Sequence, residues 1–214
     1  MDLQSRSNKF SLAVLSHLTN ELAAFDPWHL EENTFEQSRY AVILNMVRRF
    51  KPCKFLEVGP AAGVLTERLR KIASSLWIVD SMALALTRTH KRLNYDPSIV
   101  MLCSSISDTK LPQCYFDVVL ICEVLYYLHT IRQVTRALRN CLRALKPSGT
   151  LIFSSACDEV VHRWGLKYGA ESCLQILIRN CNVVELAEVT GDNQDEHALI
   201  VSLQPLCQRK FQQG

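Results

Sequence analysis

The chain lacks the features that mark membrane-spanning, secreted and zinc-binding proteins. None of its apolar stretches reaches the roughly 18 residues that span a bilayer. Its first residues contain no apolar segment typical of a signal peptide. It has nine cysteines but no Cys-x-x-Cys pair, which argues against a zinc knuckle or a redox dithiol. We therefore expect a cytoplasmic protein with free thiols, no membrane insertion and no bound metal.

An excess of charge of one sign is also missing. The 24 Lys and Arg residues against 21 Asp and Glu give a net charge of only +3, and the basic residues are scattered along the chain. A nucleic-acid-binding surface needs clustered basic residues, so we expect no nucleic-acid partner. The chain contains no low-complexity run, and its 214 residues predict a single domain, 1–214, with a full core.

The most informative stretch that is present is Lys54-Phe-Leu-Glu-Val-Gly-Pro-Ala-Ala-Gly63. The apolar residues up to Val58 predict a buried strand, and the residues after Gly63 have the apolar spacing of a helix. Gly59 and Gly63 bracket the turn, where a Cβ would block the approach of the backbone to a ligand. The spacing is Gly-x-x-x-Gly rather than the dinucleotide fingerprint Gly-x-Gly-x-x-Gly. It favours the looser turn of S-adenosylmethionine (SAM) enzymes.

Strands and helices alternate along the rest of the chain. Strands are predicted at 53–58, 76–80, 99–103, 116–122 and 150–154, and helices at 63–73, 130–145 and 169–179, with another ending near 94. Two further strands, at 183–187 and 198–203, are separated by a polar loop and predict an antiparallel hairpin. This alternation predicts a mainly parallel, Rossmann-like sheet with right-handed crossovers.

Two helices are expected before the first strand, at 8–24 and 34–50. The second begins with Thr34 and has Gln37 three residues on, which is a capping-box pattern. Leading helices often cover the open edge of the site in Rossmann-like proteins. We therefore expect residues 1–50 to form a helical lid over a core of 51–204, with 205–214 as a tail.

Polar residues follow the ends of the predicted strands. Asp80 lies about 20 residues after the glycine turn, the spacing of a nucleoside-binding α/β unit. Its carboxylate either accepts the ribose hydroxyls or caps the following helix. Ser105 follows the third strand, and Glu123 follows the fourth with Tyr126 and Tyr127 close behind. We expect one of the two tyrosines to pack in the core.

Together these motifs resemble the SAM-dependent methyltransferases. The motifs that carry the resemblance are Leu56-Glu-Val-Gly-x-Ala-Ala-Gly63, Ile-Val-Asp80 and Glu123-Val-Leu-Tyr-Tyr-Leu128. Within this superfamily the chain is most similar to the family of rhizobial nodulation N-methyltransferases, NodS, through Asp26-Pro-Trp28 and Arg163-Trp-Gly165. The likeness implies the class I methyltransferase fold, an α/β fold with seven strands and a C-terminal antiparallel hairpin. It also implies SAM as the methyl donor.

The resemblance also implies an activity and a set of site residues. The implied reaction methylates the free amine of a de-N-acetylated glucosamine at the non-reducing end of a chitooligosaccharide, a Nod factor precursor. The implied catalytic residues are Glu123, Tyr126 and Tyr127. The implied cofactor-binding residues are Trp28, Arg39, Glu57, Gly59, Ala61, Gly63, Asp80, Ser81, Met82, Ser105, Ile106 and Glu123. The implied substrate-binding residues are Trp28, Tyr127, Arg163 and Trp164.

Several of these residues have two possible roles. Glu123 either orients the amine and accepts its proton, or serves the cofactor or the turn after its strand. Trp28 either covers the core or contacts a ligand. Arg39 meets a carboxylate of SAM or of the protein. His129, a lone histidine, is expected to be structural.

The chain departs from the family pattern in the cofactor motifs. Pro60 stands where the family has a cysteine, so one backbone N–H donor is missing. Ser105 stands where the family has an aspartate that would contact the adenine amino group, and the proline expected after Met82 is absent. Two other functions therefore stay open. One is a SAM methyltransferase for another small amine or hydroxyl metabolite, and the other is a protein that keeps the fold without catalysis.

Overall fold

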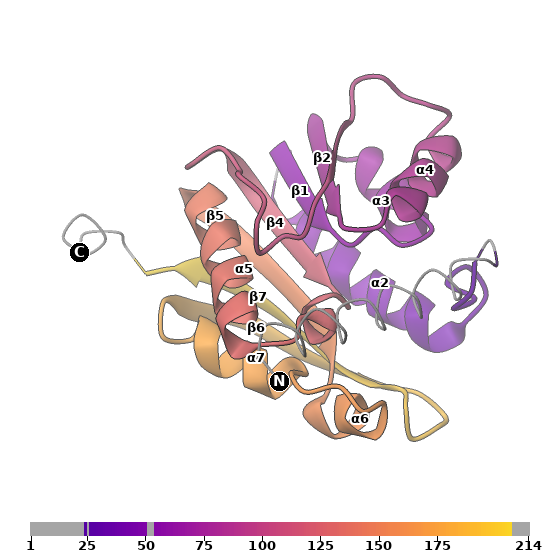
Figure 1. The fold of residues 1–214 in the computed structure, drawn as a ribbon, viewed down its shortest axis with the longest axis vertical. Helices are drawn as coiled ribbons and strands as arrows, with labels where there is room; N and C mark the ends of the chain where they lie inside the picture. Colours follow the sequence, from indigo (N-terminus) through magenta and orange to yellow (C-terminus); the bar gives the residue numbers. More distant parts are fainter. Residues whose placement is uncertain (1–23, 25, 51–53, 207–214) are drawn as a thin grey trace, which may run out of the picture.

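A seven-stranded sheet forms the centre of the computed structural model, which describes residues 24, 26–50 and 54–206 (Figure 1). The strand order is β3-β2-β1-β4-β5-β7-β6. The strands are β1 (Lys54–Val58), β2 (Ser75–Asp80), β3 (Val100–Cys103), β4 (Phe116–Cys122), β5 (Leu145–Ala156), β6 (Cys181–Thr190) and β7 (His197–Pro205). Strands β1 to β5 pair in parallel, whereas β7 is antiparallel to both β5 and β6. The predicted parallel sheet and C-terminal antiparallel hairpin are confirmed.

Helices cover both faces of the sheet. They are α2 (Thr34–Arg48), α3 (Val64–Arg70), α4 (Ala83–Arg92), α5 (Ile131–Ala144), α6 (Asp158–Arg163) and α7 (Ala170–Leu177), with a 3₁₀ turn η1 (Leu125–Tyr127). Helices α2, α3 and α4 pack on one face, and α5 and α7 pack on the other (Figure 1). None of the helices in the described ranges is long and apolar enough to cross a bilayer. The helix predicted at 8–24 lies almost entirely outside the described residues.

The central strand β4 shows why the sheet lies at the core. Val118 and Leu120 face the helices of one layer, while Val119 and Ile121 face the other, and all four are fully buried. A strand that is covered on both faces needs apolar residues at every position. This explains the continuous apolar run of β4 in the sequence.

Polar caps fix the starts of two helices. At α2 the cap is Asn33, whose Oδ1 accepts from the Glu36 N–H at 3.1 Å. The capping box predicted at Thr34 is therefore wrong by one residue, because Asn33 precedes it and also has a capping side chain. At α5 a full capping box forms between Thr130 and Gln133.

The fold brings α2 and the strand ends together at one edge of the sheet. Helix α2 packs against β5, β6 and β7, and its first turns reach the carboxyl ends of the strands. The strand order reverses between β1 and β4, and open α/β sheets bind ligands at such a point. The lid role of residues 1–50 and the division into lid, core and tail stay predictions.

Candidate active site

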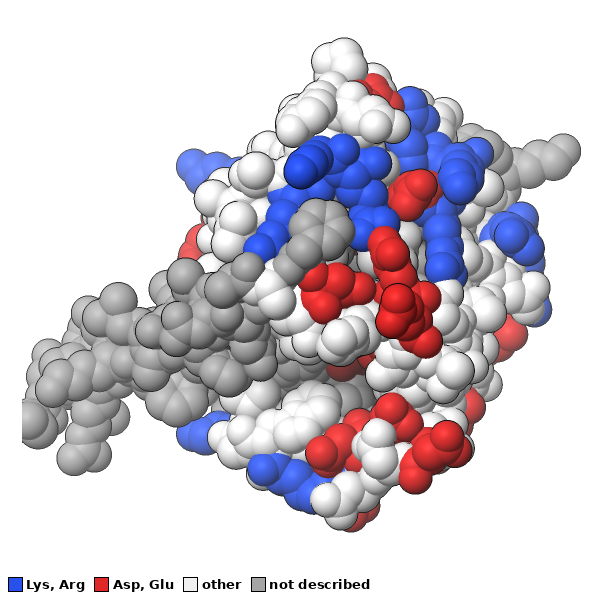
Figure 2. Space-filling model, turned by 90° about the vertical axis from the view of Figure 1, so that its right-hand side faces the viewer, with Lys and Arg blue, Asp and Glu red and all other residues white. Residues whose placement is uncertain are grey.

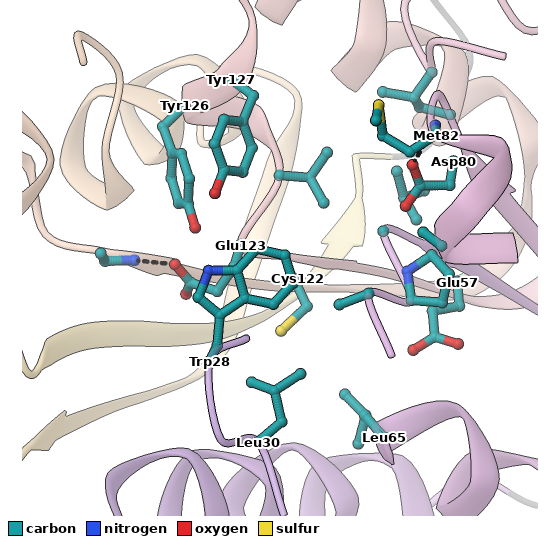
Figure 3. A pocket seen from close by; sticks show the side chains of 18 of the residues that line it. Trp28, Leu30, Glu57, Leu65, Asp80, Met82, Cys122, Glu123, Tyr126 and Tyr127 are labelled. Atoms are coloured by element: carbon teal, nitrogen blue, oxygen red, sulfur yellow. Dashed lines mark hydrogen bonds between the residues drawn. The ribbon is translucent and has the colours of Figure 1, made fainter. Parts of the chain in front are cut away.

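A cavity of about 870 Å³ lies at the carboxyl ends of β1 to β4 (Figure 3). This volume is within the range of about 300–1,000 Å³ that is usual for small-molecule sites. The predicted site residues that line it are Trp28, Arg39, Glu57, Gly59, Ala61, Asp80, Ser81, Met82, Ser105, Ile106, Glu123, Tyr126, Tyr127 and Trp164. Gly63 and Arg163 lie outside this lining. The fold thus collects residues from four strand ends, as expected for the shared edge of a parallel sheet.

The glycine turn after β1 is required by its packing. Gly59 and Gly63 have φ angles of 78° and 80°, which favour glycine. A Cβ at Gly59 would overlap Cγ2 of Val124, and one at Gly63 would lie 3.0 Å from Cα of Thr89. The structure therefore gives a packing reason for both glycines, and the close approach of the backbone to a ligand stays a prediction. The two glycines let the turn pack against the segment after β4 and against α4.

Asp80 caps the turn before α4 and also lines the cavity. Its Oδ1 accepts from the Met82 N–H at 2.7 Å, so it does cap the turn before α4. Its side chain also lines the cavity, opposite the corner formed by Tyr126 and Tyr127 (Figure 3). Burial raises the pKa of Asp80 to about 6, against the effect of the N–H groups of Met82 and Ser81. Holding a ribose stays a prediction for this carboxylate.

Glu57, near the end of β1, is the most deeply buried acid of the cavity. Its side chain is 1% exposed, and its Oε2 has no hydrogen-bond partner among the described residues. Burial raises its pKa to about 7; the nearby Thr66 hydroxyl opposes this rise, and the negative charge of Asp80 adds to it. A buried carboxylate oxygen without a partner is costly. It would be stabilised by a cationic ligand group in the cavity.

Glu123 is held in a strained conformation at the end of β4. Its φ is 52°, in the left-handed region that few non-glycine residues adopt. Its Oε2 accepts from the Ala156 N–H at 3.1 Å (Figure 3), and its Oε1 pairs with Nη1 of Arg39. Backbone strain of this kind is often found at functional sites. The carboxylate is fixed from two sides and still borders the cavity.

Arg39 bridges α2 and β4 through two carboxylates. Its side chain is only 3% exposed, and it pairs with Glu36 as well as with Glu123. Nη1 also donates to Sγ of Cys122 at 3.6 Å. Burial disfavours the charge of Arg39, but the two carboxylates outweigh it and its pKa lies above the usual value. The sequence left open whether Arg39 meets a carboxylate of SAM or of the protein. The structure shows contacts between Arg39 and two carboxylates of the protein.

Tyr126 and Tyr127 form a polar corner with Glu123. Their ring centroids lie 4.6 Å apart, and both hydroxyls point toward the side of the cavity where Glu123 lies (Figure 3). Burial, Tyr127 and Glu123 raise the pKa of Tyr126 well above its ordinary value, so it stays a neutral phenol. Tyr126 also packs with α6, which fits the expectation that one tyrosine belongs to the core. This corner offers hydroxyl donors beside a carboxylate acceptor.

Three further residues from the sequence analysis, Trp28, Arg163 and His129, have contacts that clarify their positions. Trp28 packs on the apolar core and also lines the cavity, so both roles that the sequence left open are compatible with its place. Arg163 contacts the β6–β7 loop through Asp195 instead of facing the cavity. Burial and Lys167 lower the pKa of His129, which lines the cavity and whose backbone N–H donates to Gln133.

Acidic residues outnumber basic ones in the described lining of the cavity, which the sequence analysis did not predict. Among the described residues that line it, the acids are Glu36, Glu57, Asp80, Asp108, Glu123, Asp195 and Glu196, against the single guanidinium of Arg39. In the view of Figure 2, Asp and Glu gather in the middle and lower parts of the molecule, below a group of Lys and Arg. Glu36, Asp108, Asp195 and Glu196 were missed because no motif surrounds them. Only the fold brings them to the cavity.

Comparison with known proteins gives a consistent result. The model of the family "Nodulation protein S (NodS)" matches residues 12–208. The chain is 39% identical to nodulation protein S of Rhizobium tropici over 86% of this chain and 77% of that protein. It is 38% identical to nodulation protein S of Bradyrhizobium diazoefficiens over 86% and 88% of the two chains.

A solved structure extends this likeness to three dimensions. The N-methyltransferase NodS from Bradyrhizobium japonicum WM9, in complex with S-adenosyl-L-homocysteine (SAH), is 33% identical. It matches with a TM-score of 0.86 over 90% of this chain and 98% of its own chain. The resemblance inferred from the sequence motifs is thereby confirmed. With the strand order, the cavity and these matches in agreement, the chain belongs to the NodS family.

Proposed function

We propose that this protein is a SAM-dependent N-methyltransferase of Nod factor synthesis. Its acceptor is the free amine of a de-N-acetylated glucosamine at the non-reducing end of a chitooligosaccharide. Membership of the NodS family and the SAH complex of the Bradyrhizobium japonicum protein support this proposal. The observation that carries it is the acidic cavity, with Asp80 and Glu57 at one end and the corner of Glu123, Tyr126 and Tyr127 at the other.

The residues present fit the cofactor. SAM supplies a methyl group bound to a sulfonium cation, and it also carries an ammonium and two ribose hydroxyls. Glu57 would face the ammonium, because its buried Oε2 has no partner among the described residues. Asp80 would accept from the ribose while its Oδ1 keeps the bond to Met82. Ser105 would stand near the adenine, with its hydroxyl already 3.0 Å from that of Ser107.

The opposite corner of the cavity fits an amine acceptor. An ammonium has no lone pair, so the acceptor must lose a proton before its nitrogen attacks the methyl carbon and the S–C bond breaks. Glu123 can accept that proton, and the hydroxyls of Tyr126 and Tyr127 can orient the nitrogen. The excess of carboxylates favours both the sulfonium and the protonated amine as they enter.

A cytoplasmic location is part of the proposal. The cysteines in the described ranges are all free thiols, which is typical of a reducing compartment. A nucleic-acid partner is not expected, because the net charge is only +3 and the basic residues are scattered along the chain.

The test compares glucosamine oligomers that have a free terminal amine with fully N-acetylated oligomers of the same length. We expect SAM-dependent methyl transfer only to the oligomer with the free amine. Equal transfer to both oligomers would favour another acceptor and contradict the proposal. Calorimetric titration with SAH tests the other alternative, a protein that keeps the fold but does not catalyse methyl transfer. If no heat is measured at millimolar SAH, the protein keeps the fold without the activity.

A further inference from the structure

The loop that follows β3 contains a series of hydrogen bonds that the proposed methyl-transfer chemistry does not explain. Oγ of Ser105 and Oγ of Ser107 lie 3.0 Å apart, and Oγ of Ser107 donates to Oδ2 of Asp108 at 3.0 Å. Ser105 and Asp108 line the cavity, whereas Ser107 is only 2% exposed and lies outside the lining. These three residues, here called the serine relay, therefore join two cavity-lining side chains through a buried hydroxyl.

Helix α5 holds the relay in place. Nδ2 of Asn140 donates to the carbonyls of Ile106 and Ser107 at 3.0 and 3.1 Å. Nε of Arg136 donates to the carbonyl of Ser107 at 2.7 Å, and its Nη2 pairs with Oδ1 of Asp108. The backbone of the relay and the carboxylate at its end are thus both fixed by one helix.

The direction of the hydrogen bonds in the relay follows from the number of protons. A serine hydroxyl has one proton to donate, and a carboxylate paired with a guanidinium has none. The proton of Ser107 is used in the bond to Asp108, so the bond between the two serines takes the proton of Ser105. The hydroxyl of Ser105 then has no proton left for the cavity, and it can only accept from a ligand.

We propose that the serine relay selects the base of the nucleoside, because it presents an acceptor to the amino group of adenine. Hypoxanthine has a carbonyl oxygen in place of this amino group, and two acceptors would then face each other. Ser105 is the specificity-determining residue, and Ser107 and Asp108 are positioning residues. This inference rests on the proposed function, which places the adenine near Ser105. Asp108 thus compensates, through Ser107, for the aspartate that the family has at position 105.

Two ligands that differ only in the base test the relay. They are SAH and S-inosylhomocysteine, which has hypoxanthine in place of adenine, and calorimetric titration gives the dissociation constant of each. We expect the wild-type protein to bind SAH about tenfold or more tightly, because facing acceptors leave both oxygens unpaired. Ser107→Ala should lower this preference about threefold or more, since the proton of Ser105 can then turn toward the carbonyl of hypoxanthine.

Asp108→Asn should reverse the relay. Arg136 donates to the oxygen of the amide, so the amide nitrogen faces Ser107 and donates to it. Ser107 then donates to Ser105, whose proton points into the cavity. We expect the affinity for S-inosylhomocysteine to rise and the preference for SAH to fall further than in Ser107→Ala. In the double variant Asp108→Asn should add little, because the hydroxyl that transmits the reversal is gone.

Ser98→Ala is the matched control. Oγ of Ser98 donates to Oδ1 of Asp96 at 2.6 Å, so this variant also removes a serine hydroxyl from a serine–aspartate pair, but one outside the cavity lining. It should leave the preference unchanged, and thermal unfolding checks that every variant is folded. Equal affinities of the wild-type protein for the two ligands, or an unchanged preference in Ser107→Ala, would overturn the relay. An equal effect of Asp108→Asn with and without Ser107 would also overturn it.

The two proposals fail in different ways. If SAH binds with the expected preference but no sugar amine is methylated, the proposed acceptor is wrong and the relay stands. If the amine is methylated but the preference does not respond to Ser107→Ala, the relay is wrong and the proposed function stands. If neither ligand binds, both proposals are wrong.

Discussion

Three acids of one cavity differ in their partners, and these partners define their chemistry. Glu57 is buried with an unpaired oxygen among the described residues, Asp80 is partly buried and accepts from the Met82 N–H, and Glu123 is paired with Arg39. Burial without a counter-charge raises a carboxyl pKa, as at Glu57 and Asp80. The acids at the proposed cofactor end thus titrate near neutral pH.

Because the pKa of Glu57 is about 7 and that of Asp80 about 6, we predict that SAH binding weakens as the pH falls through this window. Protonation removes the negative charge that would face the ammonium and the ribose. Calorimetric dissociation constants measured from pH 8 down to pH 5 check this. Glu57→Gln should bind SAH more weakly at pH 8 and show a flatter pH dependence. A variant profile parallel to that of the wild-type protein would remove Glu57 from the cofactor site.

Asp80→Ala tests the double role of Asp80. We expect a loss of about 1 kcal/mol of stability, because the bond from the Met82 N–H disappears. We also expect SAH affinity to fall about tenfold or more, since a charge-assisted hydrogen bond is typically worth about 1.5–3 kcal/mol. Thermal unfolding measures the first effect and calorimetry the second. If stability drops while SAH affinity is unchanged, Asp80 is only a cap.

Glu123→Gln separates catalysis from cofactor binding. Glutamine keeps an oxygen for the Ala156 N–H but cannot take a proton from the amine. We expect kcat to fall about 100-fold or more, the usual size of a general-base contribution, with little change in SAH affinity. Single-turnover methyl transfer and calorimetry provide the two numbers. A loss of affinity with kcat retained would mean that Glu123 serves the cofactor.

At the scale of elements, the turn between β1 and α3 depends on its packing. Gly59→Ala would force a methyl group into Cγ2 of Val124 at a φ of 78°. We predict that this variant loses about 2 kcal/mol or more of stability, from the overlap and the backbone strain together. In the double variant with Val124→Ala the overlap is gone, and part of the loss should return. Chemical denaturation measures both. No recovery in the double variant would show that backbone strain alone is responsible.

Elements were predictable from sequence where a periodic apolar pattern was long enough. Strand β4 and helix α5 have such patterns, and both form close to their predicted bounds. Helix α6 and the turn η1 were not predicted, because six and three residues are too short for a helical repeat to be visible. Helix α2 begins at Thr34 as predicted, but its cap is Asn33 rather than Thr34, because two adjacent side chains can cap a helix. Local choices of this kind are decided by tertiary packing.

At the scale of the whole molecule, the sheet explains which site residues the sequence could predict. Asp80, Ser105 and Glu123 each follow a parallel strand, and parallel strands end at the same edge. Their meeting in one cavity could therefore be inferred without coordinates. Glu36 and Asp195 come from a helix and a loop that reach this edge only after packing, so no sequence spacing indicates them.

The distribution of charge also arises only from the fold. A chain with a net charge of +3 forms a cavity lined by several carboxylates and a single guanidinium among its described residues. Arg39 illustrates the same point. The sequence left its partner open, and packing between α2 and β4 gives it two carboxylates. Net charge therefore says little about the field inside the site.

The central claim is that one cavity holds the nucleoside at β1 and β2 and the reacting amine at the end of β4. A crystal structure of the protein with SAH tests it most directly. We predict that the ribose contacts Asp80, the ammonium approaches Glu57, and the sulfur faces the corner of Glu123, Tyr126 and Tyr127. An empty cavity in crystals grown at saturating SAH, or a sulfur directed away from Glu123, would contradict the account.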